Sequence, residues 1–310
     1  MTERKLAADV ILEVRKAVVG KDAVLSKALL AILARGHILL EDIPGVGKTT
    51  MALAFSRALS LRYHRVQFTP DVMPSDLTGF TMFNKATGQM EYQPGAVLCN
   101  LCLADELNRA TSRTQSALLE AMEEGQVTVD GVTHPVPQPF LVIATQNPAG
   151  ASGTQLLPDS QLDRFMVKLS LGYPSAADET ELLRRKQSGN PLSQVERVAT
   201  LEELEAMRTA VDRVYLSDAV CEYIVRLIGA TREHPLIVQG ASPRATLAVA
   251  AMSRAAAFVR GRDYVTPNDV RLVFADTISH RLLLSPRGES GEVGSPVEAI
   301  LKGVQSPAIQ

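Results

Sequence analysis

A glycine-rich loop constrains the fold of this chain more than any other segment. It follows a short apolar run, precedes a helical pattern, and reads Asp42-Ile43-Pro44-Gly45-Val46-Gly47-Lys48-Thr49. The backbone N–H groups of such a loop point inward and hold phosphates at the N-terminus of the following helix. We expect the stretch from Asp42 to Thr50 to bind a nucleotide, with Lys48 on the β- and γ-phosphates and the Thr49 hydroxyl on Mg²⁺. Asp42 stands where this pattern usually begins with glycine, and an accidental glycine-rich turn is the alternative.

Two acidic residues end a later apolar run. Leu101-Cys102-Leu103-Ala104 leads directly to Asp105 and Glu106. Beside a phosphate site, Asp105 would contact the shell of Mg²⁺ and Glu106 would polarise an attacking water. A solvated strand end is the alternative for this pair taken alone.

Asn147 follows the next apolar run, residues 140–145. An asparagine there falls at the ligand-binding edge of an open α/β sheet, where its amide can bond the γ-phosphate and the water. The alternative is an asparagine that only makes a turn before Pro148.

The order of apolar runs and helices predicts an α/β domain with a parallel sheet over residues 1–172. Asp130-Gly131 favours a type I′ turn, which predicts a hairpin over residues 126–136. From residue 173, capped helical patterns replace the strand signals, so we expect a helical domain over residues 173–284. Residues 285–310 are expected to form a flexible tail with a short helix over 297–304. The strands are expected at residues 37–40, 65–68, 97–104, 140–145 and 166–171.

Composition excludes several other classes of protein. The chain has 310 residues with a net charge of -2, whereas a general electrostatic binder of nucleic acid is clearly basic. We see no signal peptide and no run long enough to span a membrane. An odd number of cysteines, Cys99, Cys102 and Cys221, speaks against a disulfide framework, and no nearby ligand pair completes a zinc site. We therefore expect a reduced, cytoplasmic protein.

Taken together, these motifs resemble those of the MoxR family of AAA+ ATPases. The likeness rests on residues 44–49, on Ala104-Asp105-Glu106-Leu107-Asn108-Arg109-Ala110 and on residues 144–148. It is supported by residues 68–71, 74–76, 162–165 and 242–244. It implies a three-layer α/β/α nucleotide-binding domain followed by a smaller all-helical lid. Magnesium-chelatase, CbbQ-type and MCM-like subunits are related alternatives.

The resemblance also implies roles for individual residues. Asn147 matches the sensor-1 residue, Arg244 the sensor-2 residue of the lid, and Val19 with Gly20 the segment that packs on adenine. Arg164 matches the arginine finger that reaches a neighbour's nucleotide, with Arg109 and Arg113 as alternatives. Residues 69–88 match an insert into the second helix of the fold. That insert and the hairpin at 126–136 usually face a central pore.

The expected function is therefore Mg²⁺-dependent ATP hydrolysis in a ring, a hexamer by resemblance. Lys48, Arg164, Glu106 and Asn147 would be catalytic, and nucleotide would lie between the α/β domain and the lid. Hydrolysis would drive chaperone-like remodelling of a partner protein, for example one with a von Willebrand A domain. A nucleotide-gated switch with little hydrolysis is one alternative. A nucleic-acid motor is another, although residues 126–136 carry no Lys or Arg.

Overall fold

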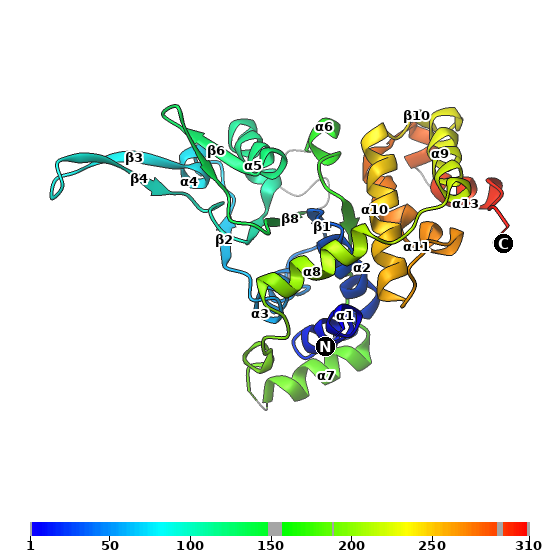
Figure 1. The fold of residues 1–310 in the computed structure, drawn as a ribbon, viewed down its shortest axis with the longest axis horizontal. Coiled ribbons are helices and arrows are strands. Elements are labelled where there is room, and N and C mark those ends of the chain that lie inside the picture. Colours follow the sequence, from blue (N-terminus) through cyan, green and yellow to red (C-terminus); the bar gives the residue numbers. More distant parts are fainter. Residues whose placement is uncertain (1, 148–156, 188, 290–293, 309–310) are drawn as a thin grey trace.

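A five-stranded parallel sheet forms the centre of the computed structural model, which describes residues 2–147, 157–187, 189–289 and 294–308 (Figure 1). The strand order is β2-β5-β8-β1-β9, and every neighbouring pair is parallel. This arrangement confirms the α/β class predicted from the short apolar runs. The strands are β1 (Ile38–Glu41), β2 (Tyr63–Gln67), β5 (Leu101–Asp105), β8 (Leu141–Gln146) and β9 (Val167–Leu169).

Helices cover both faces of this sheet, which makes three layers. Side chains of a strand point alternately to its two faces. Leu40 and Leu103 accordingly join one buried cluster with α1 (Glu3–Val14), α2 (Asp22–Leu33) and α3 (Lys48–Ala58). Leu39 and Val142 join the other cluster, with α5 (Ser112–Glu124).

The C-terminal region is helical, and its helices begin where the sequence predicts capping residues. The side chains of Thr200, Ser217 and Ser242 each accept a hydrogen bond from the backbone N–H three residues later. Its apolar residues belong to the same buried cluster as α1 and α2, so the two parts share a core on that side. The long helices are α7 (Ala176–Gln187), α8 (Leu201–Asp212), α9 (Asp218–Glu233), α10 (Pro243–Val259) and α11 (Pro267–Ile278).

Two features of this region differ from the sequence predictions. Strands β10 (Ile237–Gln239) and β11 (Leu283–Leu284) pair antiparallel, so the lid is not wholly helical. Strands this short have no periodicity that the sequence could display. In the expected tail, α13 (Pro296–Gly303) buries Val297 and Ile300 and packs against α9 and α11. This apolar face makes the segment part of the lid.

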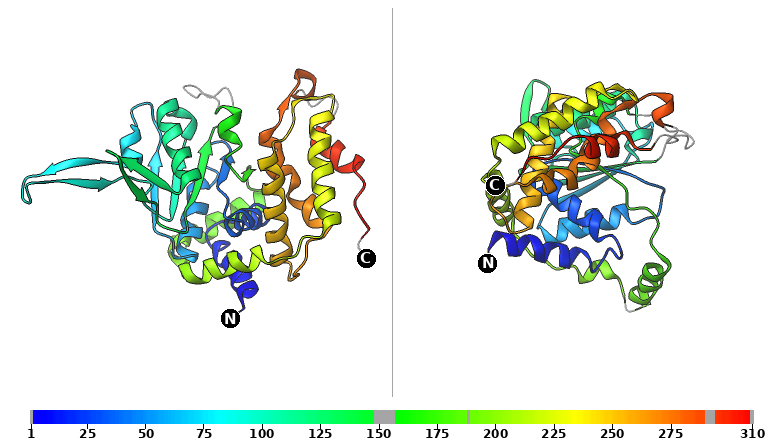
Figure 2. Two further views of the ribbon diagram at one scale, coloured as in Figure 1. Left: turned by 45° about the horizontal axis from the view of Figure 1, so that its top comes forward. Right: turned by 90° about the vertical axis from the view of Figure 1, so that its right-hand side faces the viewer.

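Two hairpins interrupt the α/β domain. Strands β3 (Gly79–Asn84) and β4 (Gln89–Pro94) project from the end of the molecule opposite α13 (Figure 2). Strands β6 (Gln126–Val129) and β7 (Val132–Pro135) follow α5. The shorter elements are α4 (Pro74–Thr78), α6 (Asp159–Leu162), α12 (Pro286–Glu289), η1 (Leu107–Arg109), η2 (Pro191–Gln194) and η3 (Ser279–Arg281). Within the described ranges, every helix is too short or too polar to cross a membrane.

A buried carboxylate joins the end of α10 to the start of α11. The Asp269 side chain is fully buried and accepts hydrogen bonds from both Nη atoms of Arg262, at 2.6 Å each, and from Arg260 at 3.1 Å. The Thr266 backbone N–H donates to it as well, at 2.8 Å. Burial raises the pKa of Asp269, but the hydrogen bonds from Arg262 and Thr266 outweigh it and hold the pKa below its usual value.

We expect Asp269→Asn to lower the free energy of unfolding by about 2 kcal/mol at pH 7, because it leaves Arg262 without its buried counter-charge. Since the native pKa of Asp269 is depressed, this contribution is present above the unfolded pKa near 4 and is lost as the pH falls through the native value. Guanidinium denaturation of both proteins at pH 7 and pH 3 measures it. An equal difference at the two pH values would contradict the assignment.

Candidate functional site

The glycine-rich loop has the open shape that a phosphate group needs. It connects β1 to α3, and Gly45 and Gly47 have φ angles of +86° and +98°. Residues with side chains rarely adopt these values, so glycine is required for the backbone at both positions. A Cβ built on either glycine would meet nothing within 4 Å, so the space beside both glycines is open. Its residues therefore fit a bound phosphate.

Asp42 anchors this loop. Its side chain is buried and accepts hydrogen bonds from the Ser170 hydroxyl at 2.8 Å, the Leu171 N–H at 2.5 Å and the Gly172 N–H at 3.0 Å. The carboxylate is thus directed at the chain that follows β9. Asp42, the first residue of the expected nucleotide-binding stretch, thus uses its carboxylate to tie the start of the loop to the chain after β9.

Lys48 is buried at the first position of α3. Its ammonium donates to the Asp42 carbonyl at 2.6 Å. Burial lowers the pKa of Lys48, while the carboxylates of Asp42, Asp105 and Glu106 act in the opposite direction. The negative groups that would compensate this buried cation therefore lie at the end of β5 as well as in the loop.

Asp105 is held between two neighbouring strands. Its Oδ2 accepts from Arg65 Nη2 at 2.7 Å and from Arg65 Nε at 3.2 Å, and its Oδ1 accepts from the Thr145 hydroxyl at 2.6 Å. The parallel register places the three side chains together, because β2 and β8 flank β5. Sequence reasoning missed Arg65 and Thr145, whose only signal was their position in neighbouring apolar runs.

Glu106 turns out of the strand with a left-handed backbone, φ +57°. Its N–H donates to the Thr145 hydroxyl at 2.9 Å, and its carboxylate accepts from Arg109 Nη1 at 2.8 Å. Asn147 Nδ2 lies 3.5 Å from the other carboxylate oxygen. The structure therefore brings Glu106 and Asn147 together, and it places Arg109 in the site of its own chain.

One cavity of about 380 Å³ contains most of these groups. Its lining includes Arg65, Gln67, Asp105, Glu106 and Asn147. The loop contributes Pro44, Gly45, Gly47, Lys48, Thr49 and Thr50, whereas Ile43 and Val46 do not line it. Thr49 and Asp105, the two expected Mg²⁺ ligands, thus share one charged cavity.

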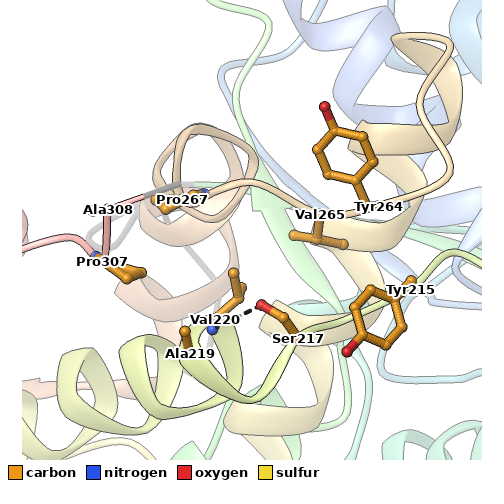
Figure 3. Close-up of a pocket in the computed structure, with 9 residues that line it drawn as sticks. All are labelled: Tyr215, Ser217, Ala219, Val220, Tyr264, Val265, Pro267, Pro307 and Ala308. Carbon is orange, nitrogen blue, oxygen red and sulfur yellow. Dashed lines mark hydrogen bonds between the residues drawn. The ribbon is translucent and has the colours of Figure 1, made fainter. Parts of the chain in front are cut away.

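A larger cavity, of about 670 Å³, lies in the lid and has a different character (Figure 3). Tyr215 and Tyr264 stand on one side, Pro307 and Ala308 on the other, with Val220 and Val265 between them. None of its nine lining residues is charged, so this cavity does not suit a phosphate.

Arg164 and Arg244 lie together but away from the loop. Both pair with Glu123, and the three residues share a small cavity with His37. His37 precedes β1 and the loop follows it, so the two groups flank opposite ends of a strand of four residues. Such a strand is about 13 Å long. Arg244, which the resemblance matches to the sensor-2 residue of the lid, therefore lies away from the loop of its own chain.

Val19 and Gly20 are not among the residues that line the loop cavity. Gly20 has φ +69°, and a Cβ there would meet the Asp178 carboxyl carbon at 2.2 Å. Lys21 donates to the Tyr173 carbonyl at 2.8 Å. This segment therefore contacts α7 and the chain just before it.

Two family models and several known proteins are similar to this chain. The model of the ATPase family associated with various cellular activities (AAA) matches residues 37–167, and that of the AAA lid domain matches residues 229–300. The uncharacterized protein YeaC of Bacillus subtilis is 43% identical, over 94% of this chain and 91% of its own. Chaperone MoxR1 of Mycobacterium tuberculosis is 38% identical, over 96% and 81%. A crystal structure described as a candidate ATPase, from Cytophaga hutchinsonii, matches with TM-score 0.91 and 38% identity, over 99% and 96%.

Two buried side chains, His280 and Arg281, contact the backbone carbonyl next to Arg164. The Phe165 carbonyl accepts from Arg281 Nη2 at 2.7 Å and lies 3.0 Å from His280 Nε2. Burial lowers the pKa of His280 to about 3, and the neighbouring Arg281 charge adds to this effect. His280 is therefore neutral in the folded protein at any pH above that value.

We expect His280 to make the free energy of unfolding fall more steeply as the pH is lowered. Its folded pKa lies below the unfolded value near 6.5, so its contribution is complete above pH 6.5 and is lost as the pH falls below it. In His280→Gln, whose amide can still donate to Phe165, the slope of unfolding free energy against pH should drop by about 1.4 kcal/mol per pH unit between pH 5.5 and 4.5. Urea denaturation at several pH values measures the slope, and parallel curves would contradict the prediction.

Proposed function

Because the chain belongs to the MoxR family of AAA+ ATPases, we propose that it hydrolyses ATP with Mg²⁺ in a ring of identical subunits. The observation that carries the proposal is the Glu106 carboxylate, which Arg109 and Asn147 hold at the cavity that Lys48 lines. A carboxylate beside a phosphate-binding loop is suited to activate a water. A site built only to hold nucleotide would not need it.

In this proposal the loop and Lys48 bind the β- and γ-phosphates. Thr49 and Asp105 would hold Mg²⁺, which when bound neutralises charge on the phosphate oxygens. Arg65 and Thr145 keep the Asp105 carboxylate oriented through both of its oxygens. Glu106 accepts the proton of the attacking water, and the Asn147 amide orders that water against the γ-phosphate.

Arg164 and Arg244 would complete a neighbouring subunit's site. Both guanidinium groups lie away from the loop of their own chain and are partly exposed, at 32% and 47%. In a closed ring each subunit presents one face to the loop of the next, which brings such groups to the phosphates. We therefore assign both arginines to the adjacent nucleotide, in a hexamer as the resemblance implies.

The client would be a protein with exposed apolar segments. The β3–β4 hairpin exposes large apolar side chains at Phe80, Met82, Phe83 and Met90, which water-facing strands seldom carry. A relative named a chaperone supports this view. A von Willebrand A domain protein is the partner class that the resemblance suggests.

We expect Glu106→Gln to lower the ATPase rate by about 10²–10⁴-fold while nucleotide still binds, because only the proton acceptor is lost. Lys48→Ala should lose hydrolysis and weaken nucleotide binding as well. Phosphate release and the binding of a fluorescent ATP analogue separate the two effects. An unchanged rate in Glu106→Gln would overturn the proposal, and ATP binding without turnover in the unmodified protein would favour a nucleotide switch.

We expect Arg164→Ala to lower the rate by about 10³-fold or more, because the neighbour's γ-phosphate loses a counter-charge. Mixing it with Glu106→Gln subunits should restore part of the rate, because some neighbouring pairs then combine an intact Glu106 in one subunit with an intact Arg164 in the other. Arg113→Ala, on the exposed start of α5, is the matched control. Loss of rate in Arg113→Ala instead would move the finger to that residue.

A further inference from the structure

One carboxylate binds both arginines that we assign to the neighbouring site. Arg164 Nη1 lies 3.0 Å from Glu123 Oε2, and Arg244 Nη2 pairs with Glu123 Oε1. The same Arg164 nitrogen donates to the Leu119 carbonyl at 2.8 Å. Glu123 therefore fills, within its own subunit, the place between two guanidinium groups that a phosphate would take.

Glu123 lies near the C-terminal end of α5, and Leu119 lies one turn before it. The N-terminal end of the same helix is tied to the turn that follows Glu106. Gln115 Nε2 donates there to the carbonyls of Ala110, at 3.2 Å, and Leu107, at 3.3 Å. One helix therefore joins the subunit's own hydrolytic carboxylate to the residue that holds the two arginines.

The arginines themselves are attached to the lid. Asp163, next to Arg164, accepts from Arg281 at 2.6 Å and from the Ser242 hydroxyl at 3.1 Å. Arg244 lies two residues after Ser242. Contacts with Arg281 and Ser242 thus link Arg164 to the lid that carries Arg244, although Arg164 itself lies in the α/β domain, just before β9.

The Glu123 contacts can be exchanged. The Glu123 side chain is 38% exposed, and ion pairs open to water hold their partners weakly. A terminal phosphate carries more negative charge than a carboxylate and offers three acceptor oxygens. The γ-phosphate of a neighbour's ATP can therefore replace Glu123 on the guanidinium groups, whereas ADP has no γ-phosphate.

We propose that Glu123 is a latch, which holds Arg164 and Arg244 on α5 until the γ-phosphate of a neighbouring subunit displaces it. The inference rests on the proposed assignment of both arginines to the adjacent nucleotide. The latch makes ring closure depend on ATP and not merely on contact between subunits. If the carboxylate only positioned the arginines, its removal would make ring assembly harder and not easier.

The test compares Glu123→Gln with Glu120→Gln, an exposed glutamate on the same helix. Sedimentation velocity gives the subunit concentration at half-maximal ring assembly, with a non-hydrolysable ATP analogue and with ADP. We expect Glu123→Gln to lower this concentration by about three- to tenfold with the analogue, because a weak competitor is gone, and to change it little with ADP. Glu120→Gln should match the unmodified protein.

A double-mutant cycle makes the test specific. In a chain that also carries Arg164→Ala and Arg244→Ala, Glu123→Gln should have no effect on assembly. Equal or weaker assembly of Glu123→Gln with the analogue overturns the latch alone. Failure of every variant to assemble overturns the ring and the latch together. If Glu123→Gln lowers the concentration needed for assembly while the unmodified protein hydrolyses no ATP, the latch stands and only the proposed ATPase activity is overturned.

Discussion

The Thr145 hydroxyl is the contact on which the rest of the site depends. It is fully buried, donates to Asp105 at 2.6 Å and accepts from the Glu106 N–H at 2.9 Å. The two acidic residues are thereby fixed in different directions, one against Arg65 and one against Arg109 and Asn147. Two adjacent carboxylates repel each other, and separate partners hold them apart. The parallel register of β5 and β8 supplies the hydroxyl at this position.

The sequence predicts the features that depend on local chemistry. The loop at Gly45 and Gly47 and the caps at Thr200, Ser217 and Ser242 are set by neighbouring residues, so they could be recognised from the chain alone. Arg65 and Thr145 could not, because each gains its role only from strand pairing. Arg244 lies away from the loop of its own chain for a similar reason. Its place is decided by how α10 packs on the rest of the chain, which no local pattern records.

Asp42 stands where a glycine usually begins such a loop, and the structure accommodates this difference. Glycine at the start of such a loop provides conformational freedom, whereas Asp42 provides a carboxylate that binds the Ser170 hydroxyl and two N–H groups after β9. Those bonds fix the beginning of the loop, while the freedom needed for phosphate binding is kept at Gly45 and Gly47. Aspartate at this position therefore changes how the loop is attached and leaves the backbone at Gly45 and Gly47 open.

The contacts around Arg164 limit how the arginines can move. Asp163 and the Phe165 carbonyl, on either side of Arg164, are both bonded by Arg281, whose side chain is 2% exposed. Buried charged hydrogen bonds cost far more to break than the exposed pairs with Glu123. When the weaker contacts are exchanged, the residues on either side of Arg164 therefore keep their contacts with Arg281, although Arg164 itself belongs to the α/β domain. In the ring proposed above, a neighbouring phosphate would then meet both cations together, because Asp163, next to Arg164, is bonded to Ser242, two residues before Arg244.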